Sequence, residues 1–189
     1  MNGRTSMATA GPAPGPVGGM TAAAAVHPGV AGGAGHRPPP RPWPLFTGLG
    51  PMGALPTAPG LARAFTALAL GSWDLASVPD LPDVSELIAS ELSTNVVRSA
   101  TGQDGSAVYQ ADGRLTQMWL RLMSDRTQVQ IELWDNLPQS AGVPVLRHPG
   151  ESEEHGRGLQ MVDRLSRDWG WNRVPGMAAK FVWALLDVR

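Results

Sequence analysis

A carboxylate and an amide lie one helical turn apart in the most regular helical segment of this sequence. The apolar stripe of that segment repeats every four residues and consists of Val84, Ile88, Leu92 and Val96. Glu91 and Asn95 fall on or beside the stripe, so both side chains point towards its core side. A carboxylate and an amide oxygen on one face can orient a hydroxyl group and hold a hard cation such as Mg²⁺. The alternative is that Glu91 lies at the edge of the stripe and pairs with a nearby arginine.

A second carboxylate ends a segment with the period of a β-strand. Val129, Ile131 and Leu133 alternate with polar or larger residues, which puts Asp135 on the same face as the apolar side chains. A buried carboxylate needs a hydrogen-bond donor, and the amino group of adenine is one candidate. A turn or capping role for Asp135-Asn136 is the alternative.

A glycine-rich tripeptide opens a further helical segment. Gly156-Arg157-Gly158 precedes Leu159, and apolar residues then continue at helical spacing. Glycines at the start of a helix let backbone N–H groups approach an anion, and the helix dipole favours negative charge there. A plain glycine hinge is the alternative. The spacing matches neither a Rossmann fingerprint nor a P-loop.

The elements that position these residues can be read from the hydrophobic pattern. Helices are predicted at about 61–73, with Leu61, Ala64, Phe65 and Leu68 on one face, at 84–100 and from residue 156 onwards. Strands are predicted at 107–111 and 115–123 around a tight Asp112-Gly113 turn, and at 129–135, 169–174 and 180–187. A long aperiodic loop covers 137–155. This order predicts an α+β fold, a two-layer α/β sandwich with a mixed, largely antiparallel sheet and helices on one face.

Composition divides the chain into a tail and a domain. The first sixty residues contain twelve of the 18 prolines, thirteen of the 23 glycines, three arginines and no acidic residue. Such a segment buries too little apolar surface to fold, so residues 1–60 are predicted to be a disordered tail. Residues 61–189 are predicted to form one domain, which is mildly acidic, and this argues against direct binding of nucleic acid by charge.

Several classes of site and location are excluded by residue usage. The chain has no cysteine, which excludes disulfides and thiolate metal sites. The N-terminal region has no apolar stretch of signal-peptide type, and no run approaches the ~20 apolar residues that span a bilayer. We therefore expect a cytoplasmic protein without membrane contact.

In their order along the chain, these features resemble the nucleotide-binding boxes of the GHKL (Bergerat-fold) ATPases. Residues 91–100, Glu-Leu-Ser-Thr-Asn-Val-Val-Arg-Ser-Ala, are similar to the N box. Asp135 corresponds to the start of the G1 box, and Gly156-Arg157-Gly158-Leu159 is similar to the G2 box. The resemblance extends over nearly all of 61–187 and is closest to the small histidine-kinase-like ATPase domains of anti-sigma-factor serine kinases.

The resemblance implies ATP and Mg²⁺ as cofactors. Asn95 would bind the Mg²⁺ that bridges the ATP phosphates, and Glu91 would be the general base for an attacking hydroxyl group. Asp135 would accept a hydrogen bond from the adenine amino group, and the 137–155 loop would be the ATP lid. Backbone donors and charge for the phosphates would come from Gly156, Arg157, Gly158 and Leu159.

Four positions depart from the family pattern. Residues 135–139, Asp-Asn-Leu-Pro-Gln, lack both glycines of the G1 pattern Asp-x-Gly-x-Gly. Ser99 stands where the N box commonly has a histidine, and Phe181 stands where a threonine usually supports the adenine contact.

The resemblance implies a regulatory function. We expect an ATP-dependent protein serine kinase that binds a sigma factor and phosphorylates a serine of a small antagonist protein, in a partner-switching system. Dimers are frequent in such proteins, which makes a homodimer one candidate assembly and leaves the oligomeric state open. The alternative is an inactive interaction module of the same fold, nucleotide-gated or nucleotide-independent, which the missing G1 glycines and Phe181 favour.

Overall fold

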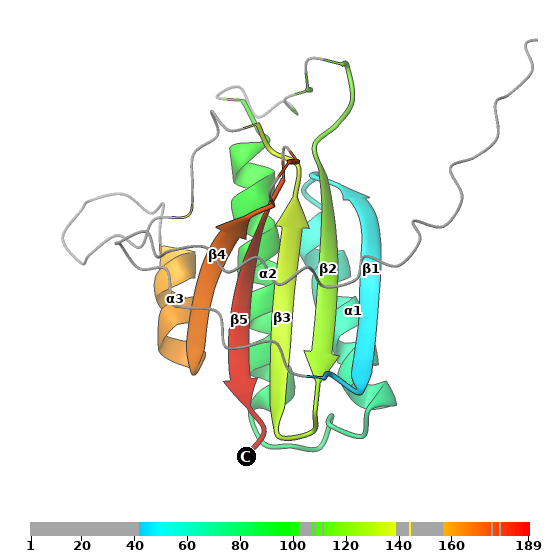
Figure 1. Cartoon of the computed structure of the whole chain (residues 1–189), viewed down its shortest axis with the longest axis vertical. Helices are drawn as coiled ribbons and strands as arrows, with labels where there is room; N and C mark the ends of the chain where they lie inside the picture. Colours follow the sequence, from blue (N-terminus) through cyan, green and yellow to red (C-terminus); the bar gives the residue numbers. More distant parts are fainter. Residues whose placement is uncertain are drawn as a thin grey trace, which may run out of the picture.

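The chain forms a five-stranded antiparallel sheet with helices packed on one face (Figure 1). The computed structural model describes residues 42–102, 107, 109–110, 112–138, 144, 157–174, 176–177 and 179–189. The strands are β1 (Leu45–Gly53), β2 (Gln117–Ser124), β3 (Gln128–Asp135), β4 (Asp168–Arg173) and β5 (Lys180–Asp187). The helices are α1 (Ala58–Ser72), α2 (Leu81–Ser99) and α3 (Arg157–Leu165). The predicted α+β two-layer fold class is confirmed.

The strand order places the last strand of the chain in the interior of the sheet. The order is β1-β2-β3-β5-β4, so β5, which comes last in the chain, lies between β3 and β4. Every neighbouring pair is antiparallel. The end of β3 therefore lies beside the start of β5, and Asp135 is directly opposite Lys180 in the ladder.

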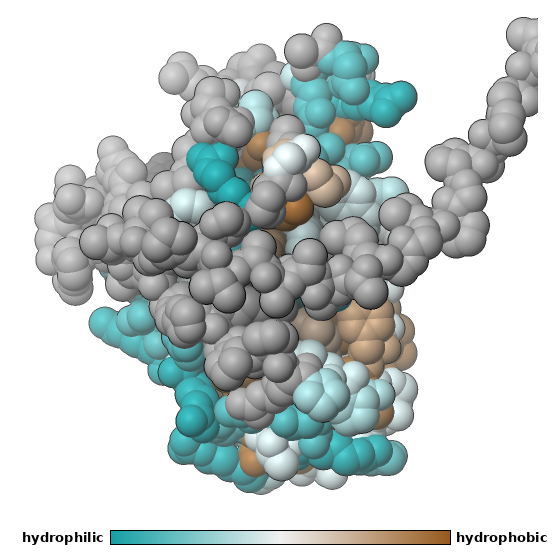
Figure 2. All heavy atoms as spheres, in the orientation of Figure 1, coloured by the Kyte–Doolittle hydropathy of each residue, from teal (hydrophilic) through white to brown (hydrophobic). Residues whose placement is uncertain are grey.

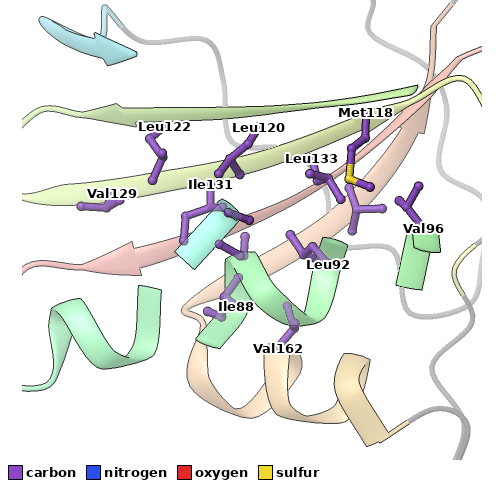
Figure 3. Close-up of a cluster of buried hydrophobic side chains, with 14 of the residues drawn as sticks. Ile88, Leu92, Val96, Met118, Leu120, Leu122, Val129, Ile131, Leu133 and Val162 are labelled. Atoms are coloured by element: carbon purple, nitrogen blue, oxygen red, sulfur yellow. The ribbon is translucent and has the colours of Figure 1, made fainter. Parts of the chain in front are cut away.

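The core lies between the inner face of the sheet and the helices (Figure 3). Alternate residues of β2 and β3 point towards the helices and are fully buried, namely Met118, Leu120, Leu122, Val129, Ile131 and Leu133. They meet Ile88, Leu92 and Val96 of α2, which confirms the predicted stripe. A stripe of this kind must be buried for a helix of this length to be stable, and burial of each large side chain contributes about 1.5–3 kcal/mol.

Helix α2 begins three residues earlier than the periodicity predicts. Pro82 lies in its first turn, where the missing N–H has no helical partner in any case. Asp83 in the first turn and Arg98 in the last turn have the charges that the helix dipole favours. The apolar stripe alone does not locate this start, because Pro82 and Asp83 separate the buried Leu81 from Val84.

The predicted buried face of α1 is wrong. Leu61 and Leu68 are 53% and 73% exposed. The face that packs on the domain is lined instead by Ala58, Ala62, Thr66, Ala69 and Leu70. These residues are mostly small, because α1 packs closely along α2, and close packing of two helices selects small side chains over large ones at the contact.

The predicted boundary at residue 61 is also wrong. Residues 45–53 form the edge strand β1, paired with β2, and α1 begins at Ala58. Leu45 and Leu49 face the core while Phe46 is exposed, so this segment alternates as a strand does. The average composition of the first sixty residues does not reveal the nine-residue strand among them, whose side chains alternate between the two faces of the sheet. The rest of the predicted tail, residues 1–41, lies outside the described residues.

The predicted hairpin around Asp112-Gly113 is present as a turn, and its described residues form isolated bridges before the regular strand begins. Gly113 has a φ of +76°, and its N–H donates to the Gln110 carbonyl at 2.9 Å. Only isolated bridges join Thr101 to Ala107 and Tyr109 to Leu115. The regular strand begins two residues later, at Gln117.

A second apolar cluster lies on the outer face of the sheet. Phe181, Trp183 and Leu185 point away from the helices, and Trp43 packs against them from the segment before β1. Phe181 stacks on Trp134 with ring centroids 4.4 Å apart.

Hydrophilic residues gather at the end of the molecule near the C-terminus (Figure 2). Among the helices of the described residues, none has both the length and the apolar character needed to cross a bilayer.

Candidate functional site

A cavity opens between α2, the adjoining ends of β3 and β5, and the first turn of α3. Its empty volume is about 450 Å³, a figure that includes space open to solvent. The lining residues are Leu92, Asn95, Val96, Ser99, Asp135, Leu137, Pro144, Leu159, Lys180 and Val182. Apolar walls with a few polar groups suit a flat, partly polar ligand such as a nucleotide base.

Asp135 is fully buried in the wall of this cavity. Its Oδ1 accepts hydrogen bonds from the Leu137 backbone N–H at 3.1 Å and from Lys180 Nζ at 2.7 Å. Its Oδ2 is buried and has no hydrogen-bond partner among the residues that the structure describes. Burial raises the pKa of the Asp135 carboxyl, and the charge of Lys180 opposes that shift. The turn role considered from the sequence is therefore real, but it engages only one of the two carboxylate oxygens.

Lys180 lines the cavity, although the sequence analysis gave it no role in the site. Its side chain is 11% exposed and forms an ion pair with Asp135. Two signals pointed to it: it is the only lysine in the chain, and it begins a strand. Neither identifies a partner 45 residues away, because the pairing depends on the register of β3 and β5.

Phe181 does not lie in the cavity. The sequence reasoning placed it beside the adenine contact, but alternation along β5 turns Phe181 to the outer face, against Trp134. Lys180 and Val182, on either side of it, are the β5 residues that line the cavity. This expectation is therefore corrected: the β5 residue next to Asp135 is Lys180.

Glu91 lies against the start of α3. A Cβ atom built on Gly158 would collide with Glu91 Oε2 and come within 3.4 Å of Glu91 Cδ. Gly158 is thus required to leave room for the carboxylate. Among the residues that the structure describes, none forms a hydrogen bond or ion pair with Glu91, so the arginine pairing considered above does not occur with any of them. A partly exposed, unpaired carboxylate can accept a proton.

Asn95 lies one turn further along α2 and lines the cavity with Asp135 and Leu159. No cluster of three or more histidine, cysteine, aspartate or glutamate side chains occurs within the described ranges. A Mg²⁺ ion here would depend on Asn95, on phosphate oxygens and on water, which is how this ion is usually held beside nucleotides. The residues therefore fit Mg²⁺ only together with a bound phosphate.

The glycine-opened helix is described only in part. α3 begins at Arg157, and Leu159 reaches the cavity. Gly156, the side chain of Arg157 and most of the 137–155 loop lie outside the described residues. Of that loop, Leu137 and Pro144 line the cavity.

The structure thus brings Asn95, Asp135 and Leu159 to one cavity and places Glu91 against Gly158. No protein-family model matches this chain, and no curated protein is significantly similar to it.

Proposed function

We propose that this protein binds Mg-ATP in the cavity beside Asp135 and acts as a protein serine kinase. The observation that carries the proposal concerns Asp135, which lines a mainly apolar cavity together with Asn95 and Leu159: its buried Oδ2 has no hydrogen-bond partner among the described residues. An unsatisfied buried acceptor costs about 1–3 kcal/mol. A ligand with an N–H group at that place, such as adenine, removes this cost.

The positions of Asn95 and Glu91 on α2 support phosphoryl transfer, because Asn95 would contact the nucleotide and Glu91 would accept the proton. Asn95 faces the cavity, and Glu91 lies one turn nearer the start of α3. In the proposed step, a serine oxygen attacks the γ-phosphorus, the bond to the β–γ bridging oxygen breaks, and ADP leaves. Glu91 accepts the hydroxyl proton. Most of the rate then comes from positioning and charge stabilisation.

The partners follow from the family resemblance of the N and G2 boxes alone. They would be a sigma factor, and a small antagonist protein that carries the phosphorylated serine, in the cytoplasm. A homodimer belongs to the same proposal.

The role of Glu91 is tested with Glu91→Gln, which keeps the side-chain volume. We expect transfer of the γ-phosphoryl group from labelled ATP to serine residues of an extract to fall by about 10²–10⁴. The calorimetric affinity for Mg-ATP should change less than about twofold, because Glu91 does not line the cavity. Glu86→Gln is the control, a partly buried carboxylate on the same helix away from the cavity. Undiminished transfer in Glu91→Gln rules out the assigned base.

An inactive interaction module remains the second candidate, because the segment that corresponds to the G1 box forms a turn whose polar groups bond to other parts of the protein. Asn136 Oδ1 accepts the Gln117 N–H at 2.7 Å, and Leu137 is buried in the cavity wall. Calorimetry with wild-type protein separates the two functions. No binding of Mg-ATP at millimolar concentration favours the nucleotide-independent module and eliminates the kinase.

A further inference from the structure

The ion pair at the base of the cavity is only half satisfied. Asp135 Oδ1 accepts from Lys180 Nζ and from the Leu137 N–H, whereas Oδ2, on the same carboxylate, accepts from no donor in the described ranges. Lys180 has three N–H donors, and within the described part of the chain Asp135 is the one partner of its ammonium group. Asp135 and Lys180 both line the cavity, so its wall contains a carboxylate with one unbonded oxygen next to a cationic donor.

A purely structural ion pair would not be built in this way. Buried ion pairs are stable when every remaining donor and acceptor is bonded, and a half-satisfied pair is worse than apolar packing. Here both residues line a cavity with otherwise mainly apolar walls. The unused acceptor and the unused donors lie on adjacent strands of one ladder, opposite each other.

We propose that Lys180 is a base-recognition residue, which donates a hydrogen bond to a ring nitrogen while Asp135 Oδ2 accepts one from the adjoining amino group. Adenine has this arrangement, an amino donor beside a ring-nitrogen acceptor. Hypoxanthine has the reverse arrangement, a carbonyl acceptor beside a ring N–H. The inference rests on the proposed function, since it takes a nucleotide in this cavity as given.

Lys180 also acts on Asp135 itself. Burial raises the pKa of Asp135, and the ammonium group opposes this shift. Loss of the ammonium therefore favours a protonated carboxyl, whose O–H is a donor, at the place where the amino group of the base needs an acceptor. Both effects of removing Lys180 weaken adenine binding.

The test is calorimetric titration of the full chain with three magnesium nucleotides. ATP has the amino group and the ring acceptor, purine riboside triphosphate has only the ring acceptor, and ITP has neither in that arrangement. We expect Lys180→Met to weaken purine riboside triphosphate by about tenfold, ATP by more than that because both effects apply to it, and ITP by less than about threefold. Arg173→Met is the matched control, because Arg173 is the exposed cation opposite Lys180 on β4, and it should leave all three affinities unchanged.

Two outcomes overturn the inference. An equal loss for all three nucleotides would mean that Lys180 attracts the phosphates, and an unchanged affinity would mean that it does not touch the ligand. Failure of wild-type protein to bind any of the three nucleotides overturns the proposed function, and this inference with it.

A second variant covers a loss of folding in Lys180→Met. Lys180→Gln keeps an N–H donor without the charge, and its folding is checked by thermal unfolding. We expect it to retain a stronger preference for ATP over ITP than Lys180→Met. If Lys180→Gln loses all preference for ATP while it remains folded, the ring-nitrogen contact is wrong.

Discussion

At the scale of single residues, the position of Glu91 depends on the absence of a side chain at Gly158. The Glu91 carboxylate occupies the space where a Cβ of residue 158 would lie. The conflicting atom is at the end of a flexible side chain, so a methyl group there moves the carboxylate rather than the backbone. The glycine therefore matters for where the candidate base points.

We predict that Gly158→Ala reduces phosphoryl transfer by at least about tenfold and changes the free energy of unfolding by less than about 1 kcal/mol. Gly71→Ala is the control, because a Cβ at Gly71 meets nothing within 4 Å. Activity assays and thermal unfolding of both variants check this. Full activity in Gly158→Ala would show that the contact does not position Glu91.

Asp187, at the opposite end of β5 from the cavity, gives a prediction about pH. Hydrogen bonds from Gln128 and Arg167 lower the pKa of Asp187 below its usual 3.8. A lowered folded-state pKa stabilises the fold above the unfolded value, and the stabilisation is lost as the pH falls through the folded-state value.

Asp187→Asn should therefore lower the free energy of unfolding at pH 7 by about 0.5 kcal/mol, a modest value because the Arg167 and Arg189 partners are exposed. The difference from wild type should shrink as the pH falls below 3.8. Chemical denaturation at several pH values measures it. A difference that stays constant down to the lowest pH would contradict the assignment to the ionised carboxylate.

At the scale of elements, α1 is the helix whose orientation the sequence pattern misassigned. The larger leucines at 61 and 68 formed the more obvious apolar face, yet the packed face is made mainly of alanines. Leu68 is 73% exposed and Leu70 is fully buried, two residues along the same helix.

We predict that Leu70→Ala destabilises the protein by about 2–5 kcal/mol, because it leaves a cavity between α1 and the rest of the core. Leu68→Ala, the same change on the exposed side, should alter stability by less than about 0.5 kcal/mol. The urea denaturation midpoints of the two variants, each compared with wild type, measure these losses of stability. Equal losses would mean that α1 is rotated relative to the orientation described here.

At the scale of the whole molecule, β1 joins the N-terminal region to the sheet. Leu45 and Leu49 pack against the main core, and Met52 and Ala54 belong to it. The edge strand also supplies the hydrogen bonds for one side of β2.

Deletion of residues 1–60 should therefore strongly destabilise the domain, because it removes β1 and the first turn of α1 and exposes β2 as a new edge. Circular dichroism and thermal unfolding, compared with the full chain, check the prediction. A shortened chain that unfolds at the same temperature as the full chain would restore residue 61 as the domain boundary.

The amino-acid sequence by itself determined the features that depend on local spacing. The stripe on α2, the alternation that turns Asp135 inwards, and the order of helices and strands follow from periods of 3.6 and 2.0 residues. These periods also placed Glu91 and Asn95 one turn apart, so these two residues and Asp135 could be singled out without coordinates.

Only the tertiary structure decided which distant residues meet. The pairing of Asp135 with Lys180, the outward direction of Phe181 and the membership of β1 in the sheet all depend on strand order and register. Register between strands far apart in the chain is set by the packing of the whole sheet and its helices, because no local pattern distinguishes one partner strand from another. The same cause left the face of α1 undetermined, since small residues become the preferred contact only where a second helix approaches closely.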